Sequence, residues 1–251
     1  MHSGGCTFLY IMEMKILALI PARGGSKGVL NKNIRSFNGK PLIGYSVDCA
    51  KQSKYVDRVM VSTDDEEIAR VGRECGAEVP FLRPTEMAGD KSPVMDAIIH
   101  HLNALKETEG YEPTHLLLLQ TTSPLRRASD IDAAVELFRS RDADSLVSCC
   151  FCENFLFTKD EEDRLSRVKN DVPMSTNRQL NTKCYRLDGC MVYLIKTDVL
   201  LREKSFLAGK LVGYEIERWR AVDIDEPQDF VVGELLQRQQ DEIDQAIKSF
   251  S

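Results

Sequence analysis

The sequence predicts an α/β protein with three αβα layers around a mainly parallel sheet. Short continuous apolar runs, such as residues 16–20 and 116–119, are typical of strands buried on both faces. These runs alternate along the chain with stretches of helical character, which favours right-handed crossovers. We therefore expect the loops after the first, third and fourth strands to face one crevice at the carboxyl edge of the sheet.

The elements follow from periodicity and from their end signals. We expect helices at residues 41–51 and 227–248, each with a proline in its first turn, and one that ends at residue 75. Thr63 and Glu66 have capping-box spacing for that helix. Further helices are expected at 93–107 and 129–139. Strands are expected at residues 16–20, 56–62, 78–82, 116–119, 145–151, 190–195, 211–216 and 221–224.

Composition limits the class of protein. The chain has 251 residues, 43% of them hydrophobic, and a net charge of -6, which argues against a nucleic-acid partner. We expect one domain at residues 14–251 after a disordered extension at residues 1–13, whose apolar piece is too short for a membrane span. Eight cysteines in mostly apolar segments indicate reduced core thiols and a cytoplasmic location. Residues 152–185 break the pattern and resemble an arm for subunit contact.

A glycine-rich basic loop, residues 21–33, follows the first strand. It contains Arg23, Gly24, Gly25, Ser26 and Lys27, and it ends in Lys32 and Asn33. Consecutive glycines let backbone N–H groups approach an anion, and three cations surround them. The loop matches neither the Walker pattern nor the dinucleotide fingerprint. The pattern favours a phosphate-binding loop, and a plain surface loop with a few basic residues is the alternative.

Two carboxylates, Asp223 and Asp225, stand at i and i+2 near the end of the last expected strand. Such carboxylates point the same way and suit Mg²⁺ bound together with substrate phosphates. Alternatively, Asp225 caps the helix that begins at Pro227. Arg178 and nearby charged residues form either a solvated face or a site for an acidic substrate, because arginine binds carboxylates in a bidentate fork.

Six spaced motifs resemble the acylneuraminate cytidylyltransferases and their relatives that act on other nonulosonic acids. The motifs run in order over nearly the whole chain from Met14, so together they are highly specific. They are Ile20 to Gly28 with Lys32-Asn33, Ser62-Thr63-Asp64, Leu82-Arg83-Pro84, Gln120-Thr121-Thr122-Ser123-Pro124-Leu125-Arg126, Asn177-Arg178-Gln179 and Asp223-Ile224-Asp225.

This resemblance implies a Rossmann-like nucleotidyltransferase fold and a homodimer that joins CTP to a 2-keto sugar acid with Mg²⁺. It implies that Arg23, Ser26 and Lys32 bind the CTP phosphates, with Ala22, Gly24 and Lys27 nearby. Asn33 would bind the ribose, and Arg83, Asp90 and Ser92 the cytosine. The sugar would contact Gln120, Thr122, Ser123, Arg178, Gln179, Tyr185, Asp188 and Asp223. Asp223 and Asp225 would hold the metal, and these two with Arg23 and Lys32 would be catalytic.

The sugar end departs from the family pattern. The run from Arg178 to Gly189 lacks a proline and carries Asp188 in place of an asparagine. An amide donates hydrogen bonds and an ionised carboxylate only accepts them, so the sugar contacts should differ. Legionaminic, pseudaminic and deaminated neuraminic acids are alternative substrates. Other readings are a sugar-1-phosphate nucleotidylyltransferase, a glycosyltransferase with an Asp-x-Asp motif, or a CTP-binding module without turnover.

Overall fold

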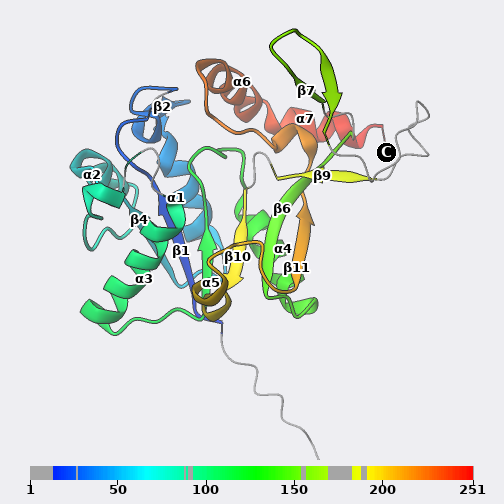
Figure 1. The fold of residues 1–251 in the computed structure, drawn as a ribbon. Helices are drawn as coiled ribbons and strands as arrows, with labels where there is room; N and C mark the ends of the chain where they lie inside the picture. Colours follow the sequence, from blue (N-terminus) through cyan, green and yellow to red (C-terminus); the bar gives the residue numbers. More distant parts are fainter. Residues whose placement is uncertain are drawn as a thin grey trace, which may run out of the picture.

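A central sheet of seven described strands runs through the protein (Figure 1). This computed structural model describes residues 14–26, 28–87, 89, 93–153, 157–168, 183–187 and 191–250. The main path has the order β11-β6-β10-β5-β1-β4, and β9 pairs with β6. The strands are β1 (Ile16–Pro21), β4 (Arg58–Ser62), β5 (His115–Leu118), β6 (Ser145–Cys152), β9 (Cys184–Arg186), β10 (Tyr193–Lys196) and β11 (Leu211–Glu215).

The sheet is mainly parallel, as the alternation of strands and helices predicts. β1 lies between β4 and β5 and is parallel to both, and β11 is parallel to β6. β10 is inserted between β5 and β6 and is antiparallel to both. The expected α/β architecture is therefore confirmed.

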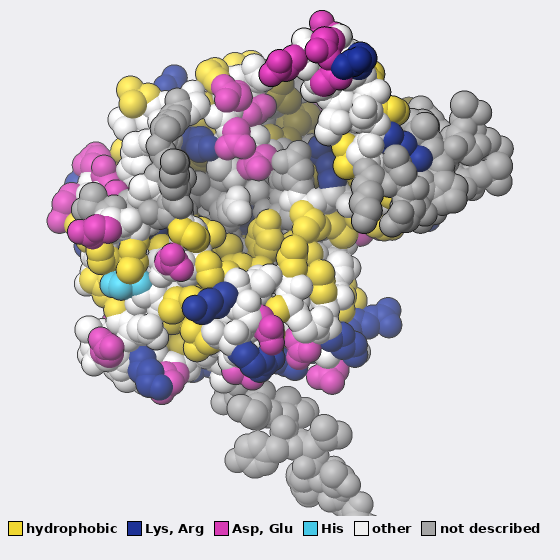
Figure 2. Space-filling view, in the orientation of Figure 1, with side chains coloured by type: hydrophobic (Ala, Val, Ile, Leu, Met, Phe, Trp, Pro, Cys, Tyr) yellow, Lys and Arg dark blue, Asp and Glu magenta, His cyan; other side chains and the backbone are white. Residues whose placement is uncertain are grey.

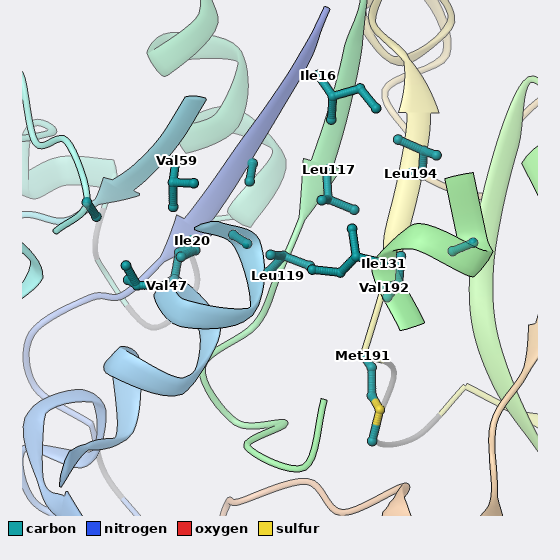
Figure 3. Packing of buried hydrophobic residues seen from close by; sticks show 14 of the residues in the cluster. Ile16, Ile20, Val47, Val59, Leu117, Leu119, Ile131, Met191, Val192 and Leu194 are labelled. Atoms are coloured by element: carbon teal, nitrogen blue, oxygen red, sulfur yellow. The ribbon is translucent and has the colours of Figure 1, made fainter. Parts of the chain in front are cut away.

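Helices cover both faces of the sheet. Successive residues of a buried strand point to opposite sides, so each face carries apolar side chains that a layer of helices must cover. Ile16, Ala18 and Ile20 of β1 belong to one apolar cluster, which Figure 3 shows, and Leu17 and Leu19 belong to another. The first cluster contains α1 (Leu42–Gln52), α2 (Glu66–Glu74) and α4 (Ala128–Ser140). The second contains α3 (Val94–Glu109) and α5 (Thr197–Glu203).

Two of the expected strands are absent from the described part of the chain. Residues 78–82 make one isolated bridge, from Glu78 to Met60. Pro80 follows closely, and its lack of an N–H prevents the ladder from continuing. Residues 221–224 also form no strand, because the Val222 N–H turns back to the carbonyl of Arg220 at 2.7 Å. The alternation rule therefore does not apply to the two aspartates of this segment.

Two helix predictions also need correction. Asp65, rather than Thr63, caps α2, because its carboxylate accepts from the Ile68 N–H at 2.9 Å. The hydroxyl of Thr63 is used in the preceding turn, where it accepts from the Asp65 N–H. The expected helix at 227–248 is divided at Gln239 into α6 (Pro227–Arg238) and α7 (Gln240–Lys248).

Short elements complete the described fold. The hairpin of β2 (Ser36–Phe37) and β3 (Lys40–Pro41) follows the basic loop. The 3-10 helix η1 (Lys32–Ile34) precedes this hairpin in the chain. Two more 3-10 helices are η2 (Thr85–Met87) and η4 (Arg218–Arg220). In the region expected to form an arm, β7 (Phe157–Lys159) and β8 (Leu165–Arg167) form a hairpin. Figure 2 shows acidic side chains gathered at its tip, where residues 160–163 are exposed. Residues 169–182 lie outside the described ones.

Two further observations concern the cysteine thiols and the length and apolarity of the helices. The six cysteines that the structure describes have free thiols. Cys149 and Cys152 have Cys-x-x-Cys spacing, but an odd separation along β6 points their side chains to opposite faces of the sheet. Within the described residues, none of the helices is both long and apolar enough to span a membrane.

Candidate active site

A cavity of about 620 Å³ opens at the carboxyl ends of β1 and β5. Four segments line it: the basic loop, the segment after Arg83, the segment after β5 and the acidic residues before α6. The expectation that these loops face one crevice is therefore confirmed. The lining residues are Pro21, Arg23, Ser26, Gly28, Lys32, Asn33, Arg83, Met87, Gly89, Val94, Leu118, Gln120, Thr121, Thr122, Asp225 and Glu226.

Asp64 fixes the basic loop beside Arg83. Its Oδ1 accepts from the Gly24 N–H at 3.1 Å and from Arg83 Nη2 at 3.3 Å. Both side chains of this ion pair are largely buried, with 5% of Arg83 and 15% of Asp64 exposed. Sequence reasoning treated the turn after β4 as a helix cap and so missed Asp64 as a site residue. Its place in the Ser62-Thr63-Asp64 motif was the available signal.

Lys32 joins the basic loop to the acidic segment, which we define as residues 221–226. Its Nζ donates to the carbonyl of Ile224 at 2.7 Å and to Asp225 Oδ1 at 2.9 Å. The Lys32 side chain is 14% exposed, whereas that of Asp225 is 68% exposed at the cavity edge. The two segments also touch at Gly28, where an added Cβ would lie 2.1 Å from the carbonyl oxygen of Asp225. A cation, an anion and a close backbone contact thus meet at one wall of the cavity.

Asn33 connects two parts of the cavity wall. Its Nδ2 donates to the carbonyl of Arg23 at 2.9 Å, and its Oδ1 accepts from Thr121 Oγ1 at 2.6 Å. Asn33 and Thr121 are both buried. The side chain that the resemblance assigns to the ribose therefore also holds the basic loop against the segment after β5. Thr121 belongs to the motif that runs from Gln120 to Arg126, but the sequence did not predict it as a site residue.

The segment after β5, residues 120–126, presents Gln120 and Thr122 to the cavity. Ser123, in contrast, is 1% exposed and does not line it. Behind this segment lies the buried guanidinium of Arg126, which donates to the carbonyls of Gln120 and Met191. Burial lowers the pKa of Arg126 to about 10. Arg126 thus fixes the backbone from which Gln120 projects.

The two predicted metal ligands differ in placement. Asp225 lines the cavity, whereas Asp223 is half-buried and does not. Asp225 does not cap α6, because Glu226 is the N-cap residue. Among the described residues there is no cluster of three or more His, Cys, Asp or Glu side chains that could hold a metal. Mg²⁺ needs only one or two protein carboxylates when phosphates supply other oxygens, so the exposed Asp225 carboxylate suits it.

Several predicted residues lie elsewhere. Tyr185 is 45% exposed on β9, packs edge-on against the ring of Phe151 and does not line the cavity. Ala22 is buried directly after β1, behind the loop. Six of the predicted residues lie outside the described part of the chain: Lys27, Asp90, Ser92, Arg178, Gln179 and Asp188.

Comparison with known proteins assigns the chain to a family. The cytidylyltransferase family profile matches residues 17–204. The chain belongs to the cytidylyltransferase family. It is therefore a nucleotidyltransferase, and the expected resemblance is confirmed.

Two named relatives and one solved structure are similar to this cytidylyltransferase. It is 37% identical to "Post-translational flagellin modification protein B" of Campylobacter coli over 88% of this chain and 94% of that protein. The chain is 33% identical to an N-acylneuraminate cytidylyltransferase of Streptococcus agalactiae over 88% of this chain and 54% of that protein. The match therefore spans about half the length of that relative. The structure titled as CMP:2-keto-3-deoxy-manno-octonic acid synthetase complexed with CTP aligns with a TM-score of 0.67, 19% identity, and coverage of 90% of this chain and 99% of the other. That likeness supports the fold.

Proposed function

We propose that this cytidylyltransferase transfers CMP from CTP to a nonulosonic acid, an N-acylneuraminate or a close relative, and releases pyrophosphate. The observation that carries the proposal is the cavity wall where Lys32 of the basic loop contacts Asp225 and the Ile224 carbonyl. This wall places a cation and a carboxylate beside a glycine-rich loop, the groups that a bound nucleoside triphosphate requires. The family match supports the same chemistry.

In this proposal the anomeric hydroxyl of the sugar attacks the α-phosphorus of CTP. The bond from that phosphorus to the bridging oxygen breaks, and pyrophosphate leaves with the negative charge. Arg23 and Lys32 line the cavity and would neutralise the charge that develops on the phosphates. Ser26 would add a hydroxyl donor, and Arg83 with Asn33 would orient the nucleoside.

Magnesium is part of the proposal, with Asp225 and its neighbour Asp223 as the residues that would hold it. When bound, Mg²⁺ supplies a positive charge that polarises the phosphate oxygens. Lys32 forms an ion pair with Asp225, and its ammonium group keeps the carboxylate turned toward the basic loop. Asp223 is half-buried and does not line the cavity, so we propose that its side chain turns toward the bound substrates, where it would either complete the metal site or accept the proton of the attacking sugar hydroxyl.

The acceptor is proposed as a class, and its identity depends on the sugar end. Similar relatives carry names for different acceptors: a CMP-N,N'-diacetyllegionaminic acid synthase of Campylobacter jejuni is 37% identical, and a pseudaminic acid cytidylyltransferase of the same species is 30% identical. Gln120 and Thr122 line the cavity on the side of the segment after β5. We propose that they contact the sugar together with Arg178.

The proposal also includes a homodimer and a cytoplasmic location. The β7–β8 hairpin exposes Phe157, Leu165 and Val168, and apolar side chains on a projecting hairpin favour contact with a second copy. The free thiols of the described cysteines suit a reducing compartment. Sedimentation of the purified chain would test the dimer.

The decisive experiment measures pyrophosphate release from CTP and Mg²⁺ with a panel of acceptors. The panel contains N-acetylneuraminic, deaminated neuraminic, legionaminic, pseudaminic and 3-deoxy-octulosonic acids. Turnover with one acceptor supports the proposal and identifies the sugar. CTP binding without turnover on the whole panel would favour the binding-module alternative. Asp225→Asn should abolish most turnover, whereas Asp241→Asn, a matched change at an exposed aspartate of α7, should not.

A further inference from the structure

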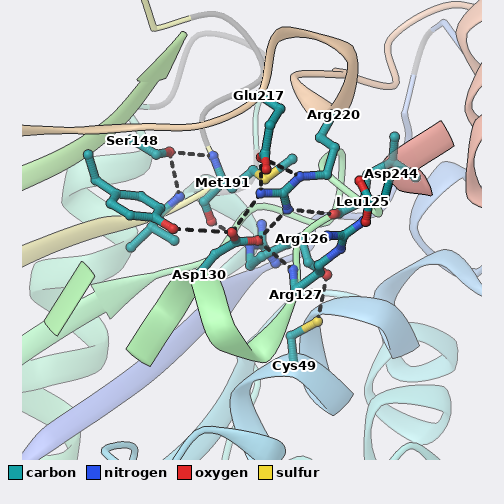
Figure 4. A network of polar contacts seen from close by, with 12 residues as sticks. Cys49, Leu125, Arg126, Arg127, Asp130, Ser148, Met191, Glu217, Arg220 and Asp244 are labelled. Atoms are coloured by element: carbon teal, nitrogen blue, oxygen red, sulfur yellow. Dashed lines mark hydrogen bonds and ion pairs between the residues drawn. The ribbon is translucent and has the colours of Figure 1, made fainter. Parts of the chain in front are cut away.

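A buried ion pair lies behind the acidic segment, outside the cavity. Arg220 is 3% exposed and Asp130 is 2% exposed. Arg220 Nη1 donates to Asp130 Oδ2 at 2.7 Å, and Nη2 donates to Oδ1 at 2.8 Å. The Arg220 Nε also donates to Glu217 at 2.8 Å, and Nη1 reaches the carbonyl of Leu125 at 3.4 Å. Figure 4 shows these groups converging on one guanidinium.

Asp130 ties this pair to three elements of the fold. It stands in the first turn of α4, where its Oδ2 accepts from the Arg127 N–H at 2.7 Å. Its Oδ1 accepts from the hydroxyl of Tyr214 on β11 at 3.4 Å. The carboxylate therefore joins α4, β11 and η4, and each of its oxygens has two donors.

Arg220 is the last residue of η4, immediately before the acidic segment. This segment has no strand partner, and its carboxyl end is held by Asp229 Oδ2, which accepts from the N–H groups of Asp225 at 3.0 Å and Glu226 at 2.7 Å. The Ile224 N–H donates to the carbonyl of Thr122 at 2.9 Å, and Lys32 donates to the carbonyl of Ile224. At the amino end of the segment, the anchor is the Arg220 side chain, whose contact with Leu125 connects it to the segment after β5.

Stability alone does not explain such a pair. Replacing a buried ion pair by neutral groups of similar volume is often neutral or stabilising, whereas removing one partner is costly. What a bidentate arginine adds is a fixed geometry, because its planar fork meets the carboxylate in one orientation. Here that orientation sets where the chain enters residues 221–226.

We infer that Arg220 is a positioning residue for the nucleotidyl transfer, which holds the acidic segment in register against residues 120–126 through its bidentate pair with Asp130. This inference rests on the proposed function of the cavity. Loosening the pair lets Asp225 shift relative to Lys32 and Gln120 while the core and the basic loop stay in place. The expected loss is therefore in turnover rather than in CTP binding.

The test compares Arg220→Met, the double variant Arg220→Met with Asp130→Asn, and the control Arg58→Met. The double variant removes the uncompensated buried charge and keeps an oxygen acceptor for the cap of α4, which restores folding if the single variant unfolds. Arg58 forms ion pairs with Glu78 and Glu109 at the other end of the sheet. The readouts are kcat, KM for CTP, CTP affinity without the sugar, melting temperature, and amide hydrogen exchange of residues 221–226.

For the folded double variant we expect kcat to fall about 100-fold, CTP affinity to change less than about threefold, and exchange in residues 221–226 to rise. Arg58→Met should leave kcat and that exchange unchanged. A folded double variant with wild-type kcat and wild-type exchange would overturn the inference, as would equal losses in CTP affinity and kcat. If the wild-type chain releases no pyrophosphate, the proposed function fails separately, and the exchange measurement still decides whether Arg220 holds the segment.

Discussion

Gly28 is the position where one added methyl group should separate the two halves of the active site. A Cβ at this residue would lie 2.1 Å from the carbonyl oxygen of Asp225 and 3.2 Å from its carbonyl carbon. Real Cβ contacts are essentially never shorter than 3.0 Å, so the basic loop and the acidic segment must move apart by about 1 Å. The obstacle is backbone, which has no alternative rotamer that would relieve the contact.

The expected effect of Gly28→Ala is large on turnover and moderate on stability. A misplacement of about 1 Å in a catalytic arrangement can cost about 100-fold in rate, and overpacking typically costs about 1–3 kcal/mol of folding free energy. The assay measures pyrophosphate release at saturating CTP and sugar, with the free energy of unfolding from urea titration. The control is Gly39→Ala, where φ is +82° and nothing lies within 4 Å of the added Cβ.

The two variants should lose comparable stability for different reasons. Gly39→Ala pays a backbone penalty of about 1–2 kcal/mol for a left-handed residue in the β2–β3 turn, which does not line the cavity, so its kcat should stay near that of the wild type. If Gly28→Ala keeps at least a third of the wild-type kcat, the close approach of the two segments is unimportant for catalysis. The reasoning from this contact would then be refuted.

Three further predictions concern pH, a buried arginine and the sugar end. Burial lowers the pKa of His101 from 6.5 to about 4. As pH drops from 6.5 to 4, the unfolded chain therefore protonates this histidine before the folded chain does. The contribution of His101 to the free energy of unfolding falls by about 3 kcal/mol over that range. Urea unfolding of His101→Leu should show a weaker loss between pH 7 and 5, and an unchanged loss would contradict this origin. Arg126→Met should destabilise by more than about 2 kcal/mol, because it leaves the Met191 carbonyl without its donor and the Gln120 carbonyl with the Ser46 hydroxyl alone; an unchanged urea midpoint would count against that role. Arg178→Ala should raise KM for the sugar far more than KM for CTP, and equal effects would remove Arg178 from the sugar site.

The sequence by itself determined the mainly parallel α/β class, most of the buried strands and the placement of the basic loop at the cavity. Buried strands such as residues 16–20 are recognisable because apolar continuity is a local property of the chain. The basic loop is recognisable for the same reason, since its glycines and cations are contiguous. The family followed from the order of six motifs, and the structure brings Arg23, Ser26, Lys32, Asn33, Arg83, Gln120, Thr122 and Asp225 to one cavity.

Only the tertiary structure decided which polar residues face the cavity and which support it. Ser123 and Thr121 are neighbours in one motif, yet Thr121 lines the cavity and Ser123 does not. Asp64 binds a partner 40 positions away, Arg126 one 65 positions away, and Arg220 pairs with Asp130 across 90 positions. No local pattern records such contacts, because hydrogen bonding depends on where distant backbone carbonyls and carboxylates meet after folding. The aspartates of residues 221–226 show the same limit: their spacing fitted a strand end, and contacts with Thr122 and Lys32 fixed a loop instead.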